Sequence, residues 1–187
     1  MVHDMNTYKF LSVPDHQKIS DCMYEYIVHH TDILKRPKFW YWLYDIPHVL
    51  EHNPDLNKYV ASLKLTPAWI GVITVTETQP EILHIDGDPG VRILWPIRNC
   101  AGTQTRFYNV DESLLEIRDL DHQTKYKLVT DPGPHEIIDQ LELTGPVAFN
   151  PGIVHSVHVS TSTEFPRLSF AMGFDCQDDR VRSVHAW

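Results

Sequence analysis

The chain has 187 residues, with 16 Lys and Arg against 25 Asp and Glu and a formal net charge of −9. This acidic balance argues against nucleic-acid binding as the main activity, because nucleic-acid-binding proteins usually present a basic face. The sequence has no run of about 18 apolar residues and no signal-peptide pattern at its start, so we predict no membrane span. The three Cys residues are far apart and predict neither a disulfide framework nor a cysteine metal site, so we expect a cytoplasmic protein.

Helical spacing of apolar residues dominates the first third of the chain. One such pattern indicates a helix from Asp15, which we expect to cap it, to about His30. Asn53 and Pro54 indicate the start of a later helix, with Asn53 as the cap and Pro54 in the first helical position. An apolar run at 9–13 indicates an early strand before the first helix.

Several His and aromatic residues in this part invite a functional interpretation. His30 and Asp32 fall at the predicted end of the first helix, and we interpret them as surface or capping residues. His48 and His52 are one helical turn apart, but no Glu follows His48 as a metalloprotease helix requires, so we interpret them as a solvated face. The aromatic run at 39–44 indicates a core plug or packed loop, or else the wall of a substrate entrance.

After Pro67 the pattern changes to short runs rich in β-branched and aromatic residues, separated by turn residues. We predict strands at about 69–76, 81–86, 91–97, 104–109, 114–118, 125–130, 136–141, 146–149, 154–159 and 167–174. About ten strands fit a double-stranded β-helix, the jelly roll of cupin-like proteins. The prediction is a mainly β protein of one domain, 1–187, in which a helical part at 1–66 packs on a jelly-roll core at 67–176.

His84 and Asp86 stand in one of these apolar runs. Alternate residues of a strand point to the same face, so both side chains share a face while Ile85 points to the other. Two imidazoles and one carboxylate form the ligand set of non-haem iron(II) oxygenases, which leaves metal positions open for reactants. The pair alone carries little information, because His30 and Asp32 form a second His-x-acid pair in a chain with 12 His.

A third ligand must come from elsewhere in the chain. His155 follows the turn at Pro151 and Gly152 and begins a predicted strand, where the mouth of a barrel would lie. His158 is the alternative, although it lies three residues further on and would point away from the face of His155. We favour His155 as the third ligand and keep His158 open.

Arg167 begins the last predicted strand, and Ser169 shares its face. An Arg that faces the interior needs an anionic partner, because burying its charge alone is costly. The far carboxylate of a 2-oxo dicarboxylic acid would be such a partner through a bidentate, charge-assisted contact, with a hydrogen bond from Ser169.

The second half of the chain resembles the Fe(II)/2-oxoglutarate-dependent dioxygenase superfamily in three motifs, HIDG, LWPIRNCAGTQTRFY and FNPGIVHSVHVSTSTEFPRLSFAMGF. It is most similar to small aspartyl/asparaginyl-hydroxylase-like members encoded by phages and marine bacteria, and the match spans about 80–174. The resemblance implies a double-stranded β-helix, iron held by His84, Asp86 and His155, and 2-oxoglutarate held at its distal carboxylate by Arg167. It also implies that Fe(II), 2-oxoglutarate and O₂ hydroxylate an amino-acid, peptidyl or small-metabolite substrate, with release of succinate and CO₂.

The resemblance leaves some positions open. Thr103, Thr105 and Tyr108 offer hydroxyls to 2-oxoglutarate, but Tyr108 faces away from Thr105, and we assign Thr105. Trp95 replaces a smaller polar residue and is expected, with Arg98, to contact the substrate. The spacing from His158 to Arg167 matches some members of the family better than the spacing from His155.

Two other functions compete with this one. A cupin-like jelly roll would bind a metal without using 2-oxoglutarate. A non-enzymatic jelly-roll binding module would leave the His-x-Asp pair incidental and would use the aromatic run at 39–44 as an interaction patch.

Overall fold

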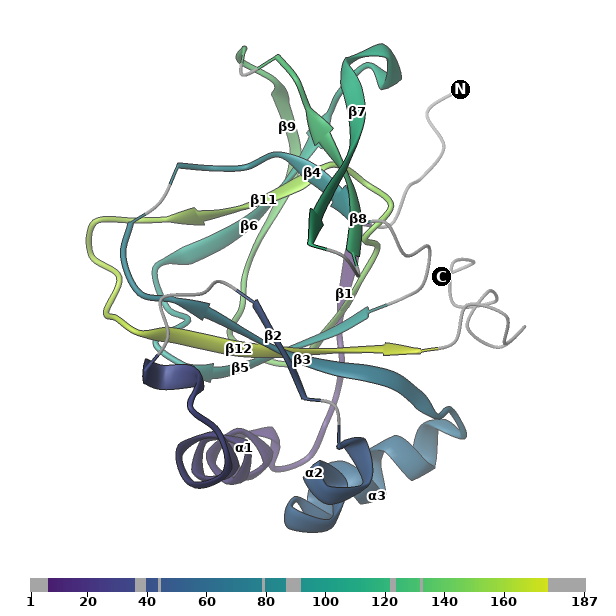
Figure 1. The fold of residues 1–187 in the computed structure, drawn as a ribbon, viewed down its shortest axis with the longest axis vertical. Helices are drawn as coiled ribbons and strands as arrows, with labels where there is room; N and C mark the ends of the chain where they lie inside the picture. Colours follow the sequence, from purple (N-terminus) through teal and green to yellow (C-terminus); the bar gives the residue numbers. More distant parts are fainter. Residues whose placement is uncertain are drawn as a thin grey trace.

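Two antiparallel sheets face each other, and helices cover the outer face of one of them (Figure 1). The computed structural model describes residues 7–35, 40–43, 45–78, 80–86, 92–121, 124–131 and 133–174, without the side chains of residues 40, 42, 118–121 and 124–126. The helix-backed sheet has six strands in the order β1 (Tyr8–Phe10), β10 (Val147–Phe149), β5 (Arg92–Arg98), β12 (Arg167–Phe174), β3 (Pro67–Val75) and β2 (Trp40–Leu43).

The second sheet also has six strands within the described ranges. Their order is β7 (Leu115–Asp121), β8 (Thr124–Val129), β4 (His84–Asp86), β11 (His155–Val159), β6 (Thr103–Asn109) and β9 (Glu136–Glu142). Neighbours in each sheet are distant in sequence: β12 lies between β3 and β5, and β11 lies between β4 and β6. This arrangement of crossing connections between two sheets confirms the predicted jelly roll with N-terminal helices.

Strand β12 is buried along its whole length because it packs on both faces. Leu168, Phe170 and Met172 join the core between this sheet and the helices. Ala171 on the opposite face packs with Phe107 of the second sheet. Each fully buried large apolar side chain contributes about 1.5–3 kcal/mol to folding, so β12 anchors both layers.

The helical layer consists of α1 (His16–His30), α2 (Ile46–His52) and α3 (Pro54–Leu63), with short 3₁₀ turns η1 (Ile33–Lys35) and η2 (Glu112–Leu114) elsewhere. The Asn53 side chain accepts a hydrogen bond from the Leu56 amide and Pro54 begins α3, which confirms that predicted helix start. Asp15 occupies the N-cap position of α1, as predicted, but the expected hydrogen bond from its side chain is absent. Its backbone is left-handed and its side chain makes no capping bond, whereas a capping side chain normally projects from extended backbone. No helix in the described ranges is long and apolar enough to span a membrane.

Several predicted elements differ in extent. The strand expected at 9–13 is β1 at Tyr8–Phe10, and the strand expected at 81–86 is limited to β4 at His84–Asp86. Part of the aromatic run at 39–44 forms the edge strand β2, which pairs with β3, while residues 39 and 44 lie outside the described residues. Tyr41 and Leu43 of β2 are buried in the core against the helices, as expected for a core element.

Candidate metal centre

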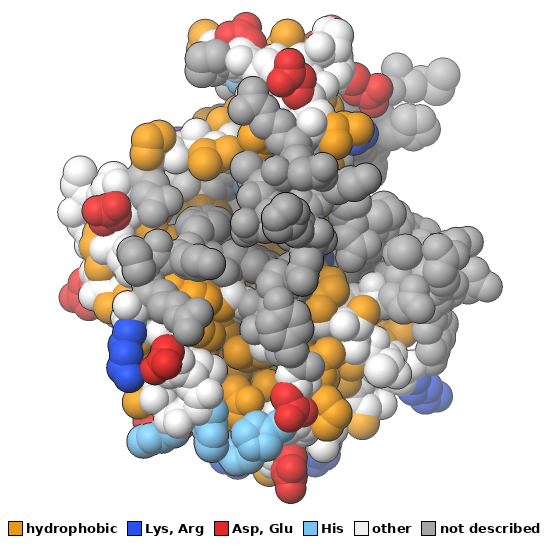
Figure 2. All heavy atoms as spheres, viewed as in Figure 1, with side chains coloured by type: hydrophobic (Ala, Val, Ile, Leu, Met, Phe, Trp, Pro, Cys, Tyr) orange, Lys and Arg blue, Asp and Glu red, His pale blue; other side chains and the backbone are white. Residues whose placement is uncertain are grey.

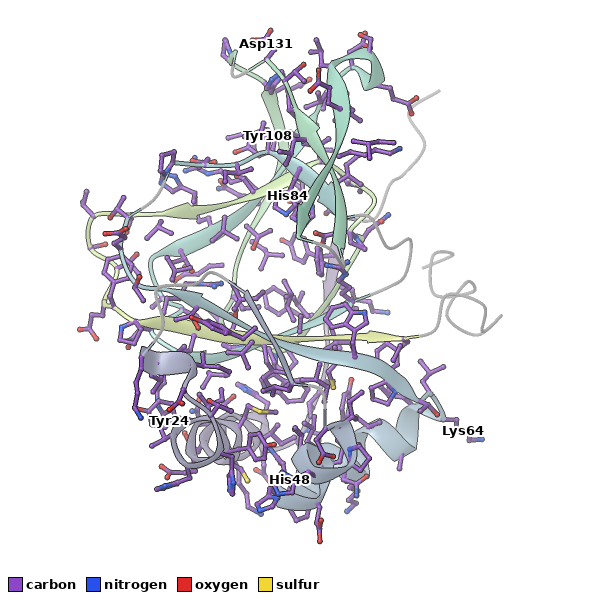
Figure 3. The ribbon with its side chains drawn as sticks, in the orientation of Figure 1. Tyr24, His48, Lys64, His84, Tyr108 and Asp131 are labelled. Carbon is purple, nitrogen blue, oxygen red and sulfur yellow. The ribbon has the colours of Figure 1, made fainter. Side chains whose placement is uncertain are left out.

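Strand β4 presents His84 and Asp86 to the interior, and β11 brings His155 beside them. His155 is the direct antiparallel partner of His84. The Nε2 atoms of His84 and His155 lie 3.5 and 3.6 Å from the two carboxylate oxygens of Asp86. One ligand atom from each of the three residues lies within 4.8 Å of the others. The three residues predicted as ligands therefore form one cluster, with His84 on the second sheet in Figure 3.

The spacing of this cluster suits a single ion. Bonds from a transition metal to imidazole nitrogen or carboxylate oxygen are about 2.0–2.2 Å long, so two ligands at right angles lie about 3 Å apart. The observed 3.5 and 3.6 Å separations exceed this only slightly, and small side-chain rotations close the difference. Two imidazoles and one carboxylate match the donor set of non-haem iron(II) sites.

Backbone carbonyls fix the orientation of both imidazoles. His84 Nδ1 lies 2.9 Å from the Ile82 carbonyl oxygen, and His155 Nδ1 lies 2.8 Å from the Ile153 carbonyl oxygen. A carbonyl only accepts, so each Nδ1 carries the proton and donates it. Each Nε2 then directs a lone pair toward Asp86, which is the tautomer that a metal requires.

His155 is the most enclosed of the three ligands. Its ring lies 5.4 Å from the ring of Phe149 and 6.2 Å from that of Phe107. Burial, followed by the neighbouring His84, lowers the pKa of His155 to about 4. The imidazole is therefore neutral at neutral pH, and the aromatic rings keep water away from it.

Arg92 is a member of this site that the sequence reasoning did not identify. Its Nη1 donates to Asp86 Oδ2 at 2.5 Å, and both side chains are buried. Its guanidinium lies 4.9 Å from the centre of the Trp69 ring. The feature of the sequence that could have identified Arg92 is a charged residue at the start of an otherwise apolar strand. Arg92 neutralises the Asp86 charge and holds the carboxylate in position.

Gly173 makes room for this support. A Cβ atom at Gly173 would lie 2.1 Å from Cε2 of Trp69, which is far inside contact distance. The indole therefore lies directly against the β12 backbone. Gly173, Trp69, Arg92 and Asp86 form a continuous chain of contacts from β12 to the candidate metal ligands.

Arg167 lies on the same interior, further along the strands. It is 3% exposed; its Nε donates to Thr103 Oγ1 at 3.1 Å, and its Nη1 donates to Ser169 Oγ at 3.1 Å. Burial lowers the pKa of Arg167, and no carboxylate pairs with it among the side chains that the structure describes. A buried guanidinium held only by hydroxyls is a site for an anion.

Thr105 lies between the metal cluster and Arg167. On β6, Phe107 is opposite His155 and Thr103 is opposite Val159, with Thr105 between them on the same face. At a rise of about 3.3 Å per residue, the Cα atoms of Phe107 and Thr103 are about 13 Å apart. Thr105 is buried, and its hydroxyl has no hydrogen-bond partner among the described residues. It is placed to bind a molecule that reaches from the metal to Arg167.

Comparison with known proteins identifies the fold. Protein-family models give no match, and curated proteins give none either. Apo HygX from Streptomyces hygroscopicus matches with a TM-score of 0.53 and 12% identity, over 91% of this chain and 82% of HygX. AviO1 from Streptomyces viridochromogenes Tue57 matches with a TM-score of 0.50 and 10% identity, over 91% of this chain and 90% of AviO1. HygX with iron bound gives a TM-score of 0.49 at 12% identity, over 91% and 83% of the two chains. The fold is a cupin-like jelly roll.

His158 lies on the outer face of this jelly roll. Its Nδ1 donates to Glu81 Oε1 at 2.6 Å, and Arg106 donates to the same oxygen at 3.0 Å. Tyr108 and Ser156 both donate to Glu81 Oε2 at 2.7 Å. His158 is therefore outside the cluster of His84, Asp86 and His155, and the geometry favours His155 as the third ligand, because odd spacing on a strand reverses the face.

Trp95 and Arg98 do not lie at the site, contrary to expectation. Trp95 is fully buried on the helix side of β5, where it stacks on Phe170 at 5.5 Å and donates to the His16 carbonyl at 3.3 Å. Arg98 pairs with Asp21 of α1 at 2.8 Å. Both residues contact the helical layer. Strand β5 is covered on both faces, so the apolar pattern of its sequence does not show which face meets the helices and which faces the candidate metal centre.

Proposed function

We propose that the protein is an Fe(II)- and 2-oxoglutarate-dependent oxygenase that hydroxylates its substrate. The observation that carries the proposal is that the His84–Asp86–His155 cluster and the buried Arg167, which has no carboxylate partner among the described side chains, lie on the same interior. The first suits iron(II), and the second suits the distal carboxylate of a dicarboxylic co-substrate. HygX, a protein with a similar fold, has a structure with iron bound.

Each residue has a distinct part in this proposal. His84, Asp86 and His155 hold the iron, and Arg92 orients Asp86. Arg167 and Ser169 bind the distal carboxylate of 2-oxoglutarate. Thr105 donates a hydrogen bond to 2-oxoglutarate. Phe107 and Phe149 exclude water beside His155.

The bound groups supply the oxidation itself: one oxygen atom of O₂ enters the substrate as hydroxyl, and the other enters succinate as 2-oxoglutarate loses CO₂. The protein contributes binding, orientation and exclusion of water. An amino acid, a peptidyl side chain or a small metabolite is the proposed substrate, and the cytoplasm is the proposed location.

An anaerobic titration tests the proposal. Metal-free protein is titrated with Fe(II) and then with 2-oxoglutarate, and the visible charge-transfer band of the chelated co-substrate is recorded. We expect a band in the wild type, none in Asp86→Ala, and a band that needs far more 2-oxoglutarate in Arg167→Ala. Arg98→Ala is the matched control, because it removes a guanidinium that pairs with Asp21 on the helical side.

Each other result has a definite meaning. Iron binding without a band supports the cupin-like reading in which 2-oxoglutarate is not used. An absence of iron binding rejects both metal-dependent functions and favours a binding module. Equal titrations of Arg167→Ala and Arg98→Ala reject the role of Arg167.

A further inference from the structure

Three imidazoles from two helices meet on the surface of the helical layer. His30 ends α1, and His48 and His52 lie on α2. The ring centres of His30 lie 5.2 Å from His48 and 4.7 Å from His52, and those of His48 and His52 are 4.1 Å apart. Ligand atoms from all three lie within 4.8 Å of one another. Figure 2 shows imidazole side chains gathered at the bottom of the molecule, over these helices.

The hydrogen bonds of this cluster leave nitrogen lone pairs available. His52 Nδ1 lies 2.9 Å from the His48 carbonyl oxygen and must donate to it, so the lone pair is on Nε2. His48 Nδ1 lies 2.9 Å from the Tyr26 hydroxyl, and in the tautomer in which Nδ1 donates to that oxygen the lone pair is on Nε2. His30 is exposed and makes no hydrogen bond to a described residue, so no hydrogen bond competes with a metal for its ring nitrogens.

Tyr26 provides a rigid base for the cluster. Tyr26 is 8% exposed, and the centre of its ring lies 4.9, 5.5 and 5.6 Å from the ring centres of His30, His48 and His52. The Cys22 thiol donates to the His52 carbonyl at 2.9 Å and ties the end of α2 to α1. The three ligands are therefore held together before any ion binds, which lowers the entropic cost of binding.

We propose that His30, His48 and His52 form a second metal site, for a zinc-class divalent transition ion. Imidazole ligands suit Zn(II), Cu(II) and Ni(II) and do not suit Mg(II) or Ca(II). Three imidazoles with one water complete the tetrahedral coordination that Zn(II) prefers. The site is separate from the candidate iron centre, since the helix-backed sheet lies between His48 and His84 (Figure 3).

A metal ion at this site links α1 to α2. Helix α2 has only seven residues, and an isolated helix below about 12–15 residues is marginal in water. An ion shared by His30 of α1 and two residues of α2 holds this short helix against its neighbour. Zinc binding thus stabilises the layer that covers the helix-backed sheet.

Zinc titration by calorimetry tests the proposal in the full chain. The parent is the double variant His84→Ala, Asp86→Ala, which lacks two ligands of the candidate iron centre, so remaining zinc binding reports on the second site. We expect the parent to bind one equivalent of Zn(II) and the wild type to bind one more. In the parent, His52→Gln or His30→Gln weakens binding at least about tenfold, since even loss of an outer partner costs 10–100-fold.

The control is His29→Gln, which removes an exposed imidazole of α1 that pairs with Glu25 outside the cluster. It is expected to leave zinc affinity unchanged. Circular dichroism of the metal-free variants verifies their fold, and two independent variants, both at exposed positions, guard against a folding defect in either. A parent that binds no zinc overturns the proposal, as does equal affinity in His52→Gln, His30→Gln and His29→Gln.

Discussion

His84 and His155 face each other across the β4–β11 pair, and each donates its Nδ1 proton to a backbone carbonyl two residues earlier in the chain. The two residues thus make the same local hydrogen bond on neighbouring strands. These hydrogen bonds to the backbone orient both imidazoles so that their Nε2 atoms converge on Asp86. A metal bound here requires little reorganisation of the protein.

The first prediction separates His155 from His158. We expect His155→Gln to weaken iron(II) binding by more than about 100-fold, because loss of even an outer partner of a metal ligand costs about 10–100-fold. His158→Gln is expected to retain wild-type iron affinity, since His158 binds Glu81 on the outer face. Competition with a coloured chelator measures both affinities, and an inverted order would assign the third ligand to His158.

The second prediction concerns the buried pair of Arg92 and Asp86. In Arg92→Met the Asp86 charge is left alone, and removing one partner of a buried pair costs about 3–5 kcal/mol in the free energy of unfolding. Iron(II) replaces the missing positive charge, so it should stabilise this variant more than the wild type. Urea unfolding with and without iron(II) measures both effects.

Arg98→Met is the control for this experiment. It removes a half-exposed pair with Asp21, and exposed pairs contribute about 0–1 kcal/mol. If Arg92→Met lowered the free energy of unfolding no more than Arg98→Met does, Arg92 would not be the charge partner of Asp86. The same conclusion would follow if iron(II) stabilised Arg92→Met no more than it stabilises the wild type.

The third prediction tests the close contact of Gly173 with Trp69. In Gly173→Ala the new methyl group overlaps the indole, and overpacking of this kind costs about 1–3 kcal/mol. Gly145→Ala is the matched control, because its nearest neighbour is His16 Nε2 at 3.9 Å. Urea unfolding compares the two variants, and equal stability would mean that the indole has room to move.

The fourth prediction concerns pH and the Glu81 cluster. Burial raises the pKa of Glu81, but hydrogen bonds from Ser156, Tyr108 and His158 outweigh this effect and hold the pKa below its usual value. The folded state therefore favours the carboxylate, and the resulting stability is present above the unfolded pKa of about 4.3 and is lost as pH falls through the lower folded pKa.

Glu81→Gln should accordingly lower the free energy of unfolding at neutral pH by about 1.5–3 kcal/mol, the typical value of hydrogen bonds to a charged group. The difference in the free energy of unfolding between Glu81→Gln and the wild type should narrow below about pH 4.3. Urea unfolding over a pH series measures it, with the exposed Glu164→Gln as control. A difference that stayed constant or grew toward acid pH would contradict the assigned role of the Glu81 charge.

Local patterns in the sequence predicted much of this fold and much of the candidate site. The two-residue period of a strand correctly put His84 with Asp86 and Arg167 with Ser169, and turn residues marked most strand boundaries. The change from helical to strand period near Pro67 marked where the helices end, although β1 and β2 of the helix-backed sheet precede it. These features depend on neighbouring residues, so the sequence alone determines them.

The remaining features required the tertiary structure, because they join residues far apart in the chain. Periodicity says which side chains share a face but not which face is interior, so Trp95 was assigned to the site although it packs against helices. The support of Asp86 by Arg92 and Trp69 depends on strands meeting across the jelly roll. The meeting of His30 with α2 likewise depends on how two helices pack on one sheet. The sequence determined the local faces, and long-range packing decided which of those faces met.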